Sequence, residues 1–241
     1  MSGHNKWSSI KHKKGKADAA RGRIFSRIIR EITVAAKNGG GDPNSNARLR
    51  AAVSSAKSEN MPADNITRAI KRGTGEIPGV QYEEIQYEGY GASGVAVMVA
   101  TFTDSRNRTT SEIRHIFSRH GGNLGENGCV AFMFHKKGII TVPLAGVEED
   151  NLLELVLNAG GDDLDKGDEE FEVSTAPEKF ELVKAALEAA KIPIAAAEVS
   201  MVPQNFIGVD AKEGDKVMRL LEALEEHDDV QHVWANAEFQ G

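Results

Sequence analysis

Residues 94–102 read GVAVMVATF, an apolar run that is almost unbroken and rich in β-branched side chains. A short run of this kind is typical of a strand that is buried on both faces. It therefore predicts the central strand of a sheet. Residues Glu83–Tyr87 predict a neighbouring strand, and the glycine-rich segment 89–94 between the two predicts a hairpin turn.

The residues that follow predict a helix and another strand. Thr109-Thr-Ser-Glu112 matches a capping box, in which a hydroxyl and a carboxylate satisfy the first amides of a helix. The helix that it starts would turn Ile113, Ile116 and Phe117 inward. Cys129–Phe134 (CVAFMF) predicts a strand.

The rest of the chain alternates short strands with single helices. Strands are predicted at 138–142, 170–174, 197–203 and 230–237, and helices at 148–159, 177–190 and 212–227. This order predicts an α+β fold with two modules built from ferredoxin-like split βαβ units. If the last helix and strand complete the first module, residues 79–134 and 206–241 form one domain, and residues 135–205 form a second domain inserted into it.

The N-terminal segment predicts a separate helical domain, residues 1–78, that opens with an extended arm. Apolar residues at 24, 25, 28, 29 and 32 form one stripe of a helix, and Arg23, Arg27 and Arg30 fall on the opposite, open face. Glycines 39–41 end that helix. Two shorter helices are predicted at 46–59 and 63–71, which gives a three-helix domain.

Charge divides the chain sharply. Residues 1–78 contain 16 Lys and Arg against 6 Asp and Glu, a net charge of +10. The remaining residues contain 13 against 30, a net charge of −17. Such a split indicates a polyanionic partner for the basic part. The alternative is that two solvated surfaces simply differ in sign.

Nucleic acid is the polyanion that the basic residues fit best. Lysines neutralise phosphates, while Trp7 and His12 are suited to stacking on unpaired bases. The alternative is that the lysines only solubilise the arm and that Trp7 anchors it by packing. The predicted contact residues are Lys6, Trp7, Lys11, His12, Lys13, Lys14, Lys16, Arg21, Arg23, Arg27, Arg30, Arg68, Lys71 and Arg72. A secondary basic patch is predicted from Arg106, Arg108, Arg114 and Arg119.

Several apparent motifs do not support enzymatic chemistry. The GxGxxG match at 89–94 leads into a strand, whereas a dinucleotide site needs a helix there. The acidic segment 163–168 lacks the glutamate of a calcium loop, and no cluster of cysteine and histidine suggests zinc. We therefore predict no enzyme, no metal and no cofactor. The single cysteine, the missing apolar signal segment and the absence of an 18-residue apolar run predict a cytoplasmic protein without a membrane span.

Many short motifs resemble the YebC/PmpR family across nearly the whole chain. They include Gly3-His-Asn-Lys-Trp7, Asp18-Ala-Ala-Arg-Gly-Arg-Ile-Phe25, Gly39-Gly-Gly-Asp-Pro43, Arg48-Leu-Arg50, Asn60-Met-Pro62, Asp64-Asn-Ile66, Arg68-Ala-Ile-Lys71, Tyr87-Glu-Gly-Tyr90, Arg106-Asn-Arg-Thr109, Glu112-Ile-Arg-His115, Gly121-Gly-Asn-Leu-Gly125 and Ala197-Glu-Val-Ser-Met201. The chain departs from the family at Asn5, at Ser105, and at Ala92-Ser93, where proline and glycine are common.

The resemblance implies three domains around a cleft and a role in gene expression. Members are described as DNA-binding transcriptional regulators. Relatives, including a mitochondrial activator of cytochrome oxidase translation, look like ribosome- or RNA-associated translation factors that act at difficult sequences such as proline runs. DNA and ribosomal RNA thus stay open as targets. A third alternative is an acidic protein–protein scaffold. We expect a monomer.

Overall fold

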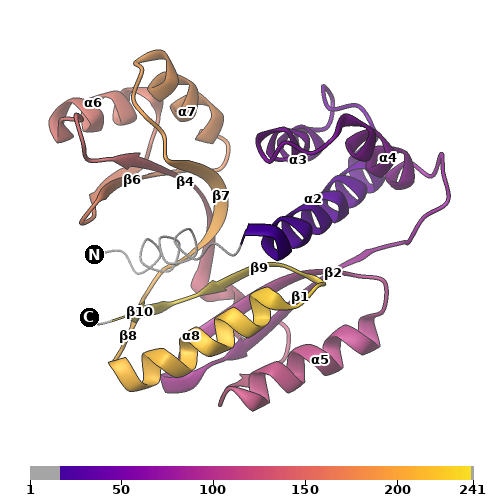
Figure 1. Ribbon diagram of the computed structural model, residues 1–241. Coiled ribbons are helices and arrows are strands. Elements are labelled where there is room, and N and C mark those ends of the chain that lie inside the picture. Colours follow the sequence, from indigo (N-terminus) through magenta and orange to yellow (C-terminus); the bar gives the residue numbers. More distant parts are fainter. Residues whose placement is uncertain (1–16, 240–241) are drawn as a thin grey trace.

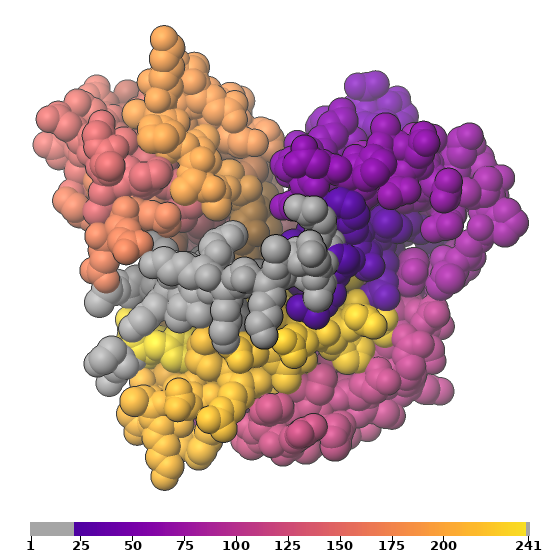
Figure 2. All heavy atoms as spheres, in the orientation of Figure 1, coloured from indigo at the N-terminus to yellow at the C-terminus, as the bar shows by residue number. Residues whose placement is uncertain are grey.

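A computed structural model describes residues 17–239, with side chains from residue 22 onward. The chain forms three lobes, and each lobe has its own hydrophobic core. In Figure 2 the helical lobe runs from indigo to purple, an inserted lobe is salmon to orange, and the third lobe combines magenta and pink with the yellow C-terminal segment. The predicted α+β fold is confirmed.

The helical lobe contains α2 (Ala17–Gly39), α3 (Ala47–Ser58) and α4 (Ala63–Gly73). Its core is formed by small and aliphatic side chains, among them Ile32 and Leu49. Asn46 joins two of the helices, because its side chain accepts from the Leu49 amide and donates to the carbonyls of Ala35 and Gly40. The predicted three-helix domain is therefore present.

The first sheet has the strand order β3-β1-β2-β9. Its strands are β1 (Glu83–Tyr90), β2 (Ala96–Thr103), β3 (Asn123–Leu124) and β9 (Val230–Ala235). The apolar run at residues 94–102 thus forms a central strand, as predicted. Helices α5 (Arg106–Arg119) and α8 (Ala211–Glu226) cover one face of the sheet, as Figure 1 shows. Phe117 and Leu220 from these helices are fully buried there.

The second sheet has the order β5-β6-β4-β7 and is inserted between β3 and α8 in the chain. It contains β4 (Phe134–Pro143), β5 (Asp163–Lys166), β6 (Glu170–Thr175) and β7 (Ala196–Pro203), with helices α6 (Glu149–Ala159) and α7 (Phe180–Ala189). The order of strands and helices along the chain is the ferredoxin-like βαββαβ unit. Strands β8 (Ile207–Val209) and β10 (Ala237–Phe239) form a short parallel pair. The domain boundaries at residues 78, 134 and 205 stay a prediction.

The connection between β1 and β2 is a tight hairpin, as predicted, and passes through the 3₁₀ turn η1 (Ala92–Gly94). The Val95 amide donates to the Ala92 carbonyl over 3.2 Å. Ser93 and Gly94 both have positive φ, 57° and 76°. Positive φ at both central residues matches the right-handed twist of the strands, but only glycine adopts it without a steric cost.

Two local predictions are wrong. The capping box at Thr109 does not start the helix, because α5 begins at Arg106 and Thr109 is buried within it. The Cys129–Phe134 strand is instead a loop with a 3₁₀ turn, η2 (Ala131–Met133), and β4 begins only at Phe134. The predicted Cys129–Phe134 strand does not form because the buried Glu88 carboxylate accepts hydrogen bonds from the amides of Gly128, Val130 and Ala131. The segment therefore bends around this carboxylate.

Within residues 17–239, no helix combines the length and apolar character that a membrane crossing requires.

Candidate nucleic-acid interface

The arginine face of α2 does not lie fully open, which corrects the sequence prediction. Arg23 is exposed, but Arg27 and Arg30 are half-buried against the turn that joins α8 to β9. The Arg27 guanidinium donates to the main-chain carbonyl of Glu225, and that of Arg30 donates to the carbonyl of Asp228. The C-terminal end of a helix carries carbonyls without intrahelical partners and partial negative charge, so it attracts guanidinium groups.

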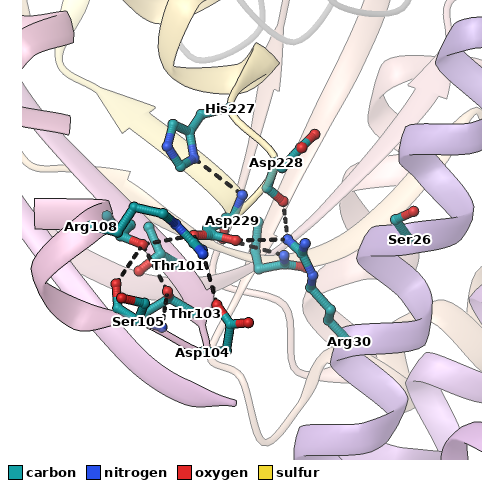
Figure 3. Close-up of polar contacts among 12 residues, drawn as sticks. Ser26, Arg30, Thr101, Thr103, Asp104, Ser105, Arg108, His227, Asp228 and Asp229 are labelled. Carbon is teal, nitrogen blue, oxygen red and sulfur yellow. Dashed lines mark hydrogen bonds and ion pairs between the residues drawn. The ribbon is translucent and has the colours of Figure 1, made fainter. Parts of the chain in front are cut away.

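Asp229 is the centre of the contact between α2 and the first sheet (Figure 3). Its side chain is only 5% exposed. One carboxylate oxygen accepts from Arg108 and from the Thr109 hydroxyl, each over 2.7 Å, and the other lies 3.4 Å from Arg30. Three separate elements, α2, α5 and the turn before β9, therefore meet at one carboxylate.

The surroundings of Asp229 keep it ionised. Burial by itself raises the pKa of a carboxyl group, but the hydrogen bonds from Thr109 and Arg108, together with the charges of Arg108 and Arg30, outweigh it. The pKa of Asp229 consequently lies below its ordinary value.

The same region contains a possible set of cation ligands. Glu112, His227 and Asp229 each place one ligand atom within 4.8 Å of the others. However, His227 lies 2.9 Å from Glu112, and the Asp229 carboxylate already binds two arginines. Guanidinium charges beside the ligand atoms oppose a metal cation, so the arrangement fits an ion-pair network better.

A second polar contact joins the helical lobe to the first sheet through Arg48. Its guanidinium lies 2.7 Å from Glu31 and 3.0 Å from Glu84, and it sits over the ring of Phe102 at 5.6 Å. Burial lowers the pKa of Arg48, but the hydrogen bonds from its two carboxylate partners raise it well above the ordinary value. Both ends of the contact between the two lobes are therefore held by arginines.

The other predicted contact residues lie apart from this cluster or outside the described residues. Arg68 and Lys71 are exposed on α4, and Arg72 is half-buried beside Gly79. The arm residues Lys6, Trp7, Lys11, His12, Lys13, Lys14 and Lys16 and the Arg21 side chain lie outside what the structure describes.

The predicted secondary patch is partly neutralised. Arg106 pairs with Glu83 over 3.3 Å, and Arg108 pairs with Asp104 over 3.0 Å as well as with Asp229. Arg114 and Arg119 are exposed on α5. The structure thus connects the two predicted arginine groups at one point, because Arg30 and Arg108 share Asp229.

Sequence reasoning missed the residues of the turn, His227, Asp228 and Asp229. No local pattern marks these residues, because their partners are distant in the chain. Asp228, for example, lies 198 positions from Arg30. The nearest signal was a histidine and two aspartates at the end of a predicted helix.

Two cavities flank Arg30 and share its side chain, His227 and Asp228. The larger, about 500 Å³, lies on the side of Arg108 and Glu112 and has mixed charge. The smaller, about 290 Å³, lies along α2 and is lined by Gly22, Arg23, Ser26, Arg27, Arg30, His227 and Asp228.

Comparison with known proteins covers the whole of this architecture. Residues 5–76 match the family model described as TACO1/YebC protein N-terminal domain, and residues 82–237 match TACO1/YebC second and third domain. A solved structure of a conserved hypothetical protein from Aquifex aeolicus is 50% identical, with a TM-score of 0.85 over 96% of each chain.

Curated relatives align along their full length. A protein from Desulfosudis oleivorans is 57% identical over 98% of this chain and 96% of its own length. One from Pelotomaculum thermopropionicum is 55% identical over the full length of both chains. Each of these two relatives is named probable transcriptional regulatory protein. On the strength of both family models and these full-length relatives, the chain belongs to the TACO1/YebC family.

Proposed function

We propose that this protein is a regulator of gene expression that binds nucleic acid through its basic helical lobe. The observation that carries the proposal is the charge division, +10 in residues 1–78 against −17 in the remainder. The names of the relatives support a regulatory role, since they are called probable transcriptional regulatory proteins. Arg23, Arg68 and Lys71 supply exposed cations on the described part of this lobe.

The geometry favours contacts to the phosphate backbone over reading of base edges. A helix that reads the major groove of DNA must present its side chains to the bases without obstruction. The arginine face of α2 is instead turned toward the α8–β9 turn. Phosphate contacts position a protein on nucleic acid without such an insertion, and they make binding strongly dependent on salt.

The arm lysines provide a direct test. Replacing Lys11, Lys13 and Lys14 by alanine should weaken binding and reduce the slope of log K against log salt by about 2 to 3, because each phosphate contact contributes about 0.7 to 0.9. The matched control replaces Lys136, Lys179 and Lys191, which are exposed lysines of the inserted lobe. Equal affinity and slope in the two triple variants would show that the basic lobe is not the binding surface.

Crosslinking in cells, followed by sequencing of the attached nucleic acid, identifies the target. Recovery of promoter DNA would support DNA-binding transcriptional regulation, and recovery of ribosomal RNA would support a ribosome-associated translation factor. Recovery of neither would contradict nucleic-acid binding and favour the acidic scaffold.

A further inference from the structure

The smaller cavity beside α2 has an unusual lining for a contact between two lobes. Arg23, Arg27 and Arg30 contribute three guanidinium groups, and Asp228 is the one carboxylate among the described residues that line it. The cavity therefore carries a net positive charge on its described surface. His227 and Asp228 come from the turn between α8 and β9, more than 190 residues along the chain from the arginines.

We propose that this cavity is a phosphate-binding pocket, in which Arg23, Arg27 and Arg30 hold one phosphate group of a bound nucleic acid strand. The inference rests on the proposed function and makes it more specific. The acidic part of the chain takes part in binding, because its turn forms one wall of the pocket. The site is thus a composite of the helical lobe and the first sheet.

The arginines are held in place before any ligand arrives. The Glu225 carbonyl at the end of α8 fixes Arg27, and the Asp228 carbonyl in the following turn fixes Arg30. The buried Asp229 carboxylate also lies 3.4 Å from Arg30. A guanidinium has five donors in a planar fork, so one carbonyl contact leaves further N–H groups for a phosphate. Arg23 is exposed at the edge of the cavity and can close over the ligand.

Charge at Arg27 also points to an anion. Burial lowers the pKa of this guanidinium, and the neighbouring charges of Arg23 and Arg30 lower it further, against the opposing effect of Glu225 and Asp228. A phosphate between the three arginines would remove that repulsion. Arginine, unlike lysine, binds phosphate through two parallel hydrogen bonds, which suits a pocket of fixed geometry.

The test uses the full-length protein and a 12-nucleotide uridine RNA labelled with fluorescein at its 3′ end, followed by anisotropy at several salt concentrations. Arg23→Gln should bind about 5- to 10-fold more weakly, with a salt slope lower by about 0.7, the value for one contact to a single strand. Arg23→Lys keeps the positive charge and should leave the salt slope unchanged. Arg50→Gln is the matched control, since Arg50 is an exposed arginine of α3 that does not line this cavity.

A second variant moves binding in the opposite direction. Asp228→Asn removes the negative charge from the lining and should tighten binding about 2- to 3-fold, which damage to the fold would not do. Comparing RNA with and without a 5′-phosphate identifies the source of the group. A loss of affinity without the 5′-phosphate that is absent in Arg23→Gln indicates a terminal phosphate in the pocket. Equal affinity for both RNAs, together with the weaker binding of Arg23→Gln, indicates an internal phosphodiester.

The two levels of the proposal fail in different ways. If the unaltered protein binds but Arg23→Gln and Asp228→Asn both behave like Arg50→Gln, the pocket is refuted and nucleic-acid binding stands. If the unaltered protein binds neither the RNA nor the corresponding thymidine DNA, both the pocket and the proposed function are refuted.

Discussion

Replacing Asp229 by asparagine tests whether the junction of the helical lobe with the first sheet depends on one buried charge. The carboxylate is 5% exposed and receives Arg108 and Thr109 over 2.7 Å each. Breaking a fully buried ion pair costs about 3–5 kcal/mol. Because the Arg108 side chain is 46% exposed, water recovers part of that loss, and we expect a destabilisation of about 2–3 kcal/mol at pH 7.

The effect should depend on pH in a defined direction. The pKa of Asp229 is lowered in the folded protein, so its contribution is fully present above the pKa of an unfolded aspartate, about 3.9, and is lost as pH falls through the folded value. The difference between the unaltered protein and Asp229→Asn should therefore be constant from pH 7 to about pH 5 and should shrink below about pH 4.

Thermal unfolding followed by circular dichroism measures this difference. For a chain of this length, the expected loss corresponds to a fall in Tm of about 5–10 °C. Asp228→Asn is the matched control, because the Asp228 side chain is exposed and Arg30 binds its main-chain carbonyl, which the substitution preserves. Its effect should stay within about 0.5 kcal/mol. Equal Tm values for the two variants at pH 7 would refute the role given to Asp229.

Three further predictions concern the first sheet. Glu88→Gln should destabilise the protein by about 2 kcal/mol in urea unfolding at pH 7, because a glutamine side chain cannot accept hydrogen bonds from all three amides of the loop 128–131. The control Glu83→Gln, at an exposed position, should change the stability little, and equal stability of the two variants would contradict this role of Glu88. Ser93→Gly should raise the free energy of unfolding by about 0.5–1 kcal/mol, because glycine has no Cβ and relieves the backbone strain at a φ of 57°. Ser93→Ala keeps the Cβ and should give no gain; a gain with alanine would show that backbone strain is not the cause. Burial, with a smaller effect of the Glu88 charge, raises the pKa of the Cys129 thiol. The Cys129 thiol should therefore react with a disulfide reagent at pH 8 more slowly than the thiol of glutathione. An equal rate would show that Cys129 is not protected in this way.

Local sequence patterns predicted most of the fold because they depend on neighbouring residues. The three-residue and four-residue spacing of isoleucines predicted α2, and the unbroken apolar run predicted β2 at the centre of its sheet. The short strands β3, β5 and β8 were missed, since two to four residues carry no periodicity. The acidic composition of residues 163–168 predicts a solvated loop, whereas Asp163–Lys166 pairs with β6.

The junction around Asp229 could not be predicted, because its partners are distant in the chain. Thr109 has the sequence context of a helix cap, but the Thr103 hydroxyl accepts from the Ser105 amide and the helix starts earlier. Thr109 then donates to a carboxylate 120 residues away. In the same way, only the fold shows that Arg27 meets the end of α8, that Arg30 meets the turn after it, and that neither is fully open to solvent.

The order of strands in the first sheet has a consequence for how the chain folds during synthesis. Strand β2 pairs with β1 on one side and with β9 on the other, and β9 leaves the ribosome only after the whole inserted lobe. The apolar face of the sheet is also completed late, since Leu220, Leu221 and Leu224 belong to α8. The inserted lobe, residues 134–203, has all its strands long before that point.

The lobe of the first sheet begins before the inserted lobe in the chain and is completed after it. A nascent chain that has passed the inserted lobe but lacks α8 and β9 leaves the edge of β2 unpaired and the apolar face of the sheet covered only by α5. Both features favour aggregation. Chains that end prematurely after residue 203 should need chaperones or rapid degradation, even though two of the three lobes already have every strand and helix described for them.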